Sequence, residues 1–149
     1  MTTPETLPIS PQSQPPVTLS VIVPVYNEAA TIREVLRRVA VVPIPKEILV
    51  VDDHSTDGTT DILKNQGDPT GLLSGVPLTA PCTLRVFFHE RNQGKGAAVR
   101  TGLTAVSGDA VIIQDADLEY NPTEYPKLLA PLLSGEADEI GRASCRERV

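Results

Sequence analysis

The chain has 149 residues, of which 40% are hydrophobic, and this is enough for one globular domain with a buried core. A net charge of −6 and an aromatic content of 3% argue against a surface that holds nucleic acid by phosphate contacts or base stacking. Only two cysteines are present, too few for a disulfide framework, so we expect a cytoplasmic protein.

Residues 1–17 form a proline-rich segment with little to bury. Proline cannot join a strand ladder or the interior of a helix, so we predict a disordered leader here. No apolar run approaches the length of a membrane span, and the amino terminus lacks the layout of a signal peptide.

The next part of the chain alternates strand and helix patterns. Residues 19–25 form a predicted strand, and residues 47–51 have the apolar run of a strand covered on both faces. Asn27 is predicted to cap the helix between them. Apolar positions of that helix recur at helical spacing: Ile32, Val35, Leu36 and Val39. A short second helix is expected over residues 59–64.

The pattern continues after a long segment, residues 65–81, that is predicted to be a surface loop. Residues 84–88 and 111–113 are predicted strands, the latter again covered on both faces. A helix is expected over residues 97–106, with four side chains facing inward: Ala98, Val99, Leu103 and Val106. A last amphipathic helix contains Pro131, and its apolar positions are Tyr125, Leu128, Leu129 and Leu132.

This alternation of strands and helices predicts an open, mainly parallel α/β sheet. With right-handed crossovers, the expected strand order is third, second, first, fourth. The first and fourth strands are then neighbours whose connections leave in opposite directions. Ligands of such sheets bind at this point, outside the carboxyl ends of the strands.

Acidic residues follow the fourth predicted strand at alternate positions. If the chain stays extended there, Asp115, Asp117 and Glu119 converge on one point, and a divalent cation between them would relieve their repulsion. The alternative is a solvated acidic turn before a helix, with Asn121 as N-cap and Pro122 at the first helical position.

Other candidate motifs are weaker. The first strand-to-helix turn has no glycine, which argues against a nicotinamide or flavin enzyme. Gly94-Lys95-Gly96 is not a phosphate-binding P-loop, and Lys95 could contact either a phosphate or only solvent. His54 and His89 have no partner at metal-ligand spacing, so both are predicted to be surface or loop residues. No Ser or Cys lies on an elbow motif that would support an acyl mechanism.

Four segments taken together resemble glycosyltransferase family 2, and most closely its branch of dolichyl- or polyprenyl-phosphate sugar synthases. They are residues 21–28 (VIVPVYNE), 50–58 (VVDDHSTDG), 92–102 (NQGKGAAVRTG) and 114–122 (QDADLEYNP). The resemblance implies the Rossmann-like A-type glycosyltransferase fold, a UDP- or GDP-sugar donor, and Mg2+ or Mn2+ as cofactor. It also implies an inverting sugar transfer to an acceptor such as a polyprenyl phosphate, which is already ionised and needs no strong base.

The resemblance also implies roles for individual residues. Those expected to line the nucleotide site are Pro24, Tyr26, Glu28, Val51 and Asp53. Asp115, Ala116 and Asp117 would meet the diphosphate and its metal, and both carboxylates would be catalytic by stabilising charge on the leaving group. Glu119 stands where some members carry Gln, and it can still ligate metal.

The resemblance covers residues 18–139, the nucleotide-sugar-binding part, and then breaks off. The last ten residues, 140–149, can be encoded by a sequence resembling a sequencing-library adaptor, so we expect an appended tail on an incomplete domain. The acceptor half and any contact with the inner face of a membrane would lie downstream, and we expect little or no transfer by this piece alone.

Two alternatives come from other functional classes. Asp52-Asp53 after an apolar strand could form the acidic pocket of a signalling receiver, although receivers place this pair after their first strand. A nucleotide-binding module without catalysis would bind the same ligand and never turn it over.

Overall fold

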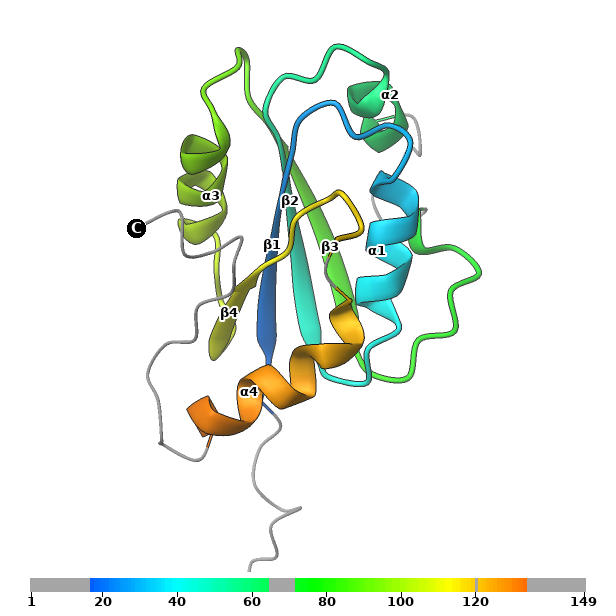
Figure 1. The fold of residues 1–149 in the computed structure, drawn as a ribbon, viewed down its shortest axis with the longest axis vertical. Helices are drawn as coiled ribbons and strands as arrows, with labels where there is room; N and C mark the ends of the chain where they lie inside the picture. Colours follow the sequence, from blue (N-terminus) through cyan, green and yellow to red (C-terminus); the bar gives the residue numbers. More distant parts are fainter. Residues whose placement is uncertain (1–16, 65–71, 120, 134–149) are drawn as a thin grey trace, which may run out of the picture.

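Four parallel strands form a sheet between helices in the computed structural model, which describes residues 17–64, 72–119 and 121–133 (Figure 1). The strands are β1 (Leu19–Val25), β2 (Lys46–Asp52), β3 (Cys82–Phe88) and β4 (Ala110–Ile113). The helices are α1 (Ile32–Ala40), α2 (Thr59–Lys64), α3 (Lys95–Leu103), the 3-10 turn η3 (Pro122–Glu124) and α4 (Tyr125–Leu133). Residues 1–16 of the predicted leader and the predicted tail, 140–149, lie outside the described residues.

The strand order is β3-β2-β1-β4, with every pair parallel, so the predicted order is confirmed. The central strand β1 pairs with β2 along its whole length, and Val25 lies opposite Asp52. On its other side Ile22 lies opposite Ile113 of β4. A receiver has its third strand beside its first, an arrangement that this order excludes.

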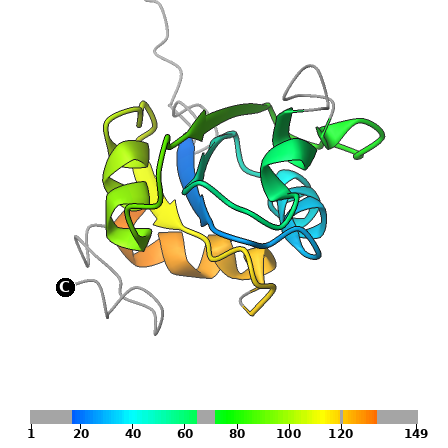
Figure 2. The same cartoon turned by 90° about the horizontal axis from the view of Figure 1, so that it is seen from above.

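Both faces of β1 are buried, because helices lie on both sides of the sheet (Figure 2). The alternate residues Val21, Val23 and Val25 join the apolar stripe of α1 in the main core cluster, which also contains Tyr125 of α4. On the opposite face α3 packs closely on Ile22. None of the helices in the described ranges is long and apolar enough to cross a bilayer.

The prediction that Asn27 caps α1 is wrong. The N-cap is Thr31, and its side chain makes no capping hydrogen bond. Asn27 instead adopts a left-handed conformation (φ 56°), and its side-chain oxygen accepts a hydrogen bond from Thr56 N–H at 2.7 Å. Its side chain is used to join two loops, a contact that local sequence does not reveal. The N-cap at Asn121, which belonged to the alternative of an acidic turn before a helix, is present, since its Oδ1 accepts from Thr123 N–H at 3.0 Å.

Two predictions about burial are wrong near α3 and β4. Leu103 ends α3 and is 49% exposed, because the helix runs over Lys95–Leu103 rather than 97–106 and turns Ala98 and Gly102, four residues apart, to the sheet. Val111 is 39% exposed, since in the described sheet β4 is an edge strand that pairs only with β1.

The predicted surface loop is anchored in the part that the structure describes. Leu72 and Leu73 are buried and belong to the main core cluster. Residues 65–71 lie outside the described residues. The segment is therefore fastened to the core before it enters β3.

Gly102 marks the closest approach of α3 to the sheet. A methyl group there would lie 2.7 Å from Cγ2 of Ile22, a fully buried and β-branched side chain. We expect Gly102→Ala to lower the free energy of unfolding by about 1–3 kcal/mol through overpacking. The matched control is Gly96→Ala in the same helix, where the new methyl group meets only Arg100 Nη1 at 3.5 Å.

Urea unfolding measures both variants. Because alanine favours helix over glycine, Gly96→Ala should gain about 0.5–1 kcal/mol. Equal effects of the two substitutions would contradict the close contact between α3 and β1.

Candidate functional site

A cavity of about 430 Å³ opens at the carboxyl ends of β1, β2 and β4, at the predicted switch point. This volume is within the range of small-molecule sites. The residues that line it are Pro24, Val25, Tyr26, Glu28, Asp53, Asn92, Gly94, Lys95, Ala98, Asp115, Ala116 and Asp117.

Every residue predicted for the site lines this cavity except Val51 and Glu119. The cavity thus brings together segments that are far apart in the sequence. The pattern of apolar residues in the sequence suggests this arrangement, and the structure establishes it. Val51 is fully buried, and it lies on the same face of β2 as Leu49, while Ile48 and Val50 face the α1 side. Glu119 is exposed beyond the lining.

The three carboxylates after β4 do not converge as expected. Among residues 17–64, 72–119 and 121–133, no group of three or more His, Cys, Asp or Glu side chains is arranged to hold a metal ion. The physical reason is that the chain leaves the extended conformation: Leu118 has φ 67°, and the N–H of Glu119 donates to Asp117 Oδ1 at 3.0 Å. Asp115 and Asp117 still share the cavity.

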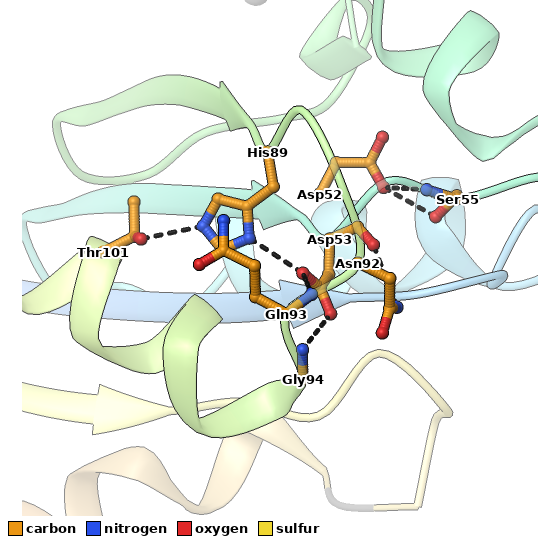
Figure 3. Close-up of polar contacts among 8 residues, drawn as sticks. All are labelled: Asp52, Asp53, Ser55, His89, Asn92, Gln93, Gly94 and Thr101. Atoms are coloured by element: carbon orange, nitrogen blue, oxygen red, sulfur yellow. Dashed lines mark hydrogen bonds and ion pairs between the residues drawn. The ribbon is translucent and has the colours of Figure 1, made fainter.

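Asp53 is the best-connected side chain of the site (Figure 3). Its carboxylate accepts hydrogen bonds from the backbone N–H of Gln93 at 2.8 Å and of Gly94 at 2.7 Å. His89 Nδ1 lies 2.8 Å from Asp53 Oδ1, and His89 Nε2 lies 2.8 Å from Thr101 Oγ1. Asp53 therefore fastens the segment between β3 and α3 to the end of β2.

The protonation of this cluster follows from its contacts. Burial alone would raise the pKa of Asp53, but the hydrogen bonds from His89, Gln93 and Gly94 outweigh it, so the pKa lies below its ordinary value. An ionised carboxylate only accepts, so His89 Nδ1 carries a hydrogen. His89 was predicted to be a surface or loop residue; it does lie in the loop after β3, but its side chain is only 9% exposed.

Asp52 and Asp53 are adjacent in sequence but have different surroundings (Figure 3). Asp52 accepts from both the N–H and the hydroxyl of Ser55, and also from the hydroxyl of Thr60. It holds the start of α2, while Asp53 lines the cavity. Successive side chains at a strand end point to opposite sides, and this separates a structural carboxylate from a site carboxylate.

The loop that carries Asp115 and Asp117 is tied to the core on two sides. Thr31 Oγ1 donates to the carbonyl of Ala116 at 2.5 Å. Tyr125 Oη donates to Gln114 Oε1 at 2.5 Å, and Gln114 Nε2 donates to the carbonyl of Asp115 at 3.2 Å. These contacts fix the backbone from which the two carboxylates project.

Negative charge dominates the cavity. Four carboxylates line it, from Glu28, Asp53, Asp115 and Asp117, and among the described lining residues Lys95 is the only cation. Burial raises the pKa of Glu28 above its ordinary value, and the nearby charge of Asp117 adds to the rise. Lys95 Nζ donates to Asp115 Oδ1 at 2.6 Å. The sequence did not decide whether Lys95 contacts a phosphate or only solvent. In the structure its ammonium contacts the carboxylate of Asp115, which lines the cavity.

This arrangement of a parallel sheet and an acidic cavity matches known proteins. Residues 20–143 match the family model described as Glycosyl transferase family 2. The chain belongs to glycosyl transferase family 2. The order β3-β2-β1-β4 and the helices around it confirm the predicted A-type fold for the part that this chain covers.

Curated family 2 relatives are longer than this chain. It is 36% identical over 115 residues to the undecaprenyl-phosphate 4-deoxy-4-formamido-L-arabinose transferase of Serratia proteamaculans, covering 74% of this chain and 32% of that relative. The chain thus spans about a third of the length of the curated relatives it matches.

Two solved family 2 structures extend the comparison. TarS 1–349 from S. aureus, in complex with UDP-GlcNAc, has a TM-score of 0.62 and 30% identity, covering 81% of this chain and 32% of that one. The mannosyltransferase PcManGT from Pyrobaculum calidifontis, in complex with GDP-Man and Mn2+, has a TM-score of 0.59 and 31% identity, covering 75% of this chain and 32% of that one.

Sequence reasoning missed His89 as a partner of Asp53, which lines the cavity. A signal was present, because Asp52 pairs with Phe88 across β2 and β3, which places the following residues, Asp53 and His89, side by side. The predicted strand order placed these two strands side by side, and the structure adds the register that pairs the two residues. The hydroxyls of Thr31 and Tyr125 gave no such signal, since their partners depend on how α1 and α4 pack.

Proposed function

We propose that the cavity holds the diphosphate of a UDP- or GDP-sugar together with a divalent cation, and that the whole protein transfers the sugar. The observation that carries the proposal is that Asp53, Asp115 and Asp117, from two distant segments, line one cavity at the switch point of the sheet. The complexes of TarS with UDP-GlcNAc and of PcManGT with GDP-Man and Mn2+ support this ligand class.

The donor set suits a cation that is shared with the ligand. Mg2+ in phosphate-handling sites is held by one or two carboxylates and by substrate phosphates, rather than by a cage of protein ligands. Asp115 and Asp117 offer two carboxylates in one cavity, so the lack of a three-residue cluster in the described ranges fits this mode. When bound there, the cation would offset the negative charge that builds on the departing diphosphate.

The chain's own groups would orient the nucleotide. Tyr26 is 47% exposed at the cavity and offers an aromatic face to a base. Asp53 keeps Gly94 and the start of α3 in place, and the amino end of a helix attracts phosphate. Lys95 lines the same cavity, so its ammonium would be within reach of a phosphate oxygen of the bound diphosphate.

A lipid phosphate is the acceptor that we propose for the whole protein. The name of the Serratia proteamaculans relative contains undecaprenyl phosphate, which supports this class. Such a phosphate is ionised near neutral pH, so the reaction does not require a strong general base in the cavity.

Calorimetry tests the binding part of the proposal. UDP and GDP are titrated into the full 149-residue chain with Mn2+, and again with EDTA. We expect one of the two to bind with Mn2+ and to lose affinity with EDTA, because the cation bridges carboxylates and diphosphate. UMP and GMP, which lack the second phosphate, are matched control ligands and should bind weakly. Absence of binding by both diphosphates in Mn2+ would contradict the proposal.

A further inference from the structure

Lys95 and Asp115 form an ion pair inside the acidic cavity. Asp115 is largely buried, with 14% of its side chain exposed, whereas 52% of the Lys95 side chain is exposed. The ammonium lies 2.6 Å from Asp115 Oδ1, so a divalent cation at the same oxygen would meet a like charge at close range. The pair thus occupies an oxygen that a divalent cation would need.

The position of Lys95 is set by the backbone that precedes it. It is the first residue of α3, and the preceding Gly94 has φ 99°, a conformation that suits glycine. The carboxylate of Asp53 holds the N–H groups of Gln93 and Gly94. Although its side chain is half exposed, Lys95 therefore begins from a fixed point at the cavity.

We propose that Lys95 competes with the divalent cation for Asp115 while the cavity holds no nucleotide, and that it moves to the phosphate oxygens when a nucleoside diphosphate binds. The inference rests on the proposed function. A diphosphate brings acceptors for the ammonium and further ligands for the metal, so both cations are satisfied at once. Metal affinity of the protein alone is then low, and it rises when the nucleotide is present.

The experiment measures free Mn2+ by electron paramagnetic resonance in titrations of the full chain, with and without UDP or GDP. Lys95→Met removes the charge and keeps the length of the side chain. We expect it to bind Mn2+ alone about three- to tenfold more tightly than the wild type, and the nucleotide with Mn2+ more weakly by a similar factor. Lys95→Arg keeps the charge and should retain the low affinity for Mn2+ alone.

Lys127→Met in α4 is the matched control, because it removes an exposed lysine outside the cavity lining. Circular dichroism confirms that the variants are folded. If the wild type binds nucleotide with Mn2+ but Lys95→Met does not tighten Mn2+ alone, the competition is refuted and the proposed function stands. If the wild type binds neither diphosphate with Mn2+, the proposed function fails and the competition fails with it.

Discussion

Asp53→Ala is expected to lower the free energy of unfolding by about 3 kcal/mol, the largest effect of any single substitution in the site. The variant removes a buried carboxylate and leaves two backbone N–H groups, of Gln93 and Gly94, without their acceptor. It also leaves His89 Nδ1 without its partner. Urea unfolding at neutral pH measures the loss.

Glu90→Ala is the control for this substitution, because Glu90 is exposed and follows His89 directly. It should change the free energy of unfolding by no more than about 0.5 kcal/mol. Similar effects of the two substitutions would contradict the role of Asp53 as the fastening between β2 and the segment that precedes α3.

The same carboxylate predicts a pH dependence. The pKa of Asp53 lies below its ordinary value in the folded protein because of hydrogen bonds that outweigh burial, so the folded state binds fewer protons than the unfolded state in mild acid. The stabilisation that ionised Asp53 contributes is fully present above its pKa in the unfolded state, about 3.9. It is lost as the pH falls through the lower pKa of Asp53 in the folded state. The stability difference between wild type and Asp53→Asn should therefore shrink below about pH 4.

Asp117→Ala should reduce the affinity for nucleotide with Mn2+ by about 100-fold, because it removes one of two carboxylates available to the cation. Asp117 is exposed, so the free energy of unfolding should stay within about 0.5 kcal/mol of the wild type. Calorimetry with the preferred diphosphate measures the affinity. Loss of stability without loss of affinity would contradict the proposed role.

Asp61→Ala is the matched control, an exposed aspartate of α2 outside the cavity lining.

Glu119→Ala tests whether Glu119 ligates the metal. The resemblance implies that Glu119 ligates the metal, but its side chain lies outside the lining, so we expect a smaller loss than for Asp117→Ala.

Strong local patterns made the fold predictable. The apolar run of β1 predicted its bounds, Leu19–Val25. The bounds expected for the short helix α2, Thr59–Lys64, are also those observed, although its sequence pattern is weaker. The strand order was predicted with right-handed crossovers, and the switch point between β1 and β4 followed from that order. What a segment packs against was not predictable from such patterns. The apolar sequence of β4 predicts a strand that is buried on both faces, yet Val111 is exposed because the described sheet ends at β4.

The site was predictable where motifs lie at strand ends, and less so where partners are distant. Asp53, Asp115 and Asp117 follow strands directly, so the sheet itself brings them together. Contacts that depend on how helices pack were not visible: the hydroxyl of Thr31 donates to the carbonyl of Ala116, 85 residues away in the sequence. The spread of Asp115, Asp117 and Glu119 was also missed, because a left-handed residue at Leu118 ended the assumed alternation.

The most direct test of the central claim is paramagnetic broadening by Mn2+ in nuclear magnetic resonance spectra of the full chain with the preferred nucleoside diphosphate. The amides of Tyr26, Gly94 and Ala116 at the cavity should broaden, and Mg2+ should leave them sharp. The amides of Ser20 and Gly108 should stay sharp, because β1 separates its two ends by roughly 20 Å. Broadened amide signals of Ser20 and Gly108, together with sharp signals at the cavity, would contradict the claim that the metal and the nucleotide bind at the cavity.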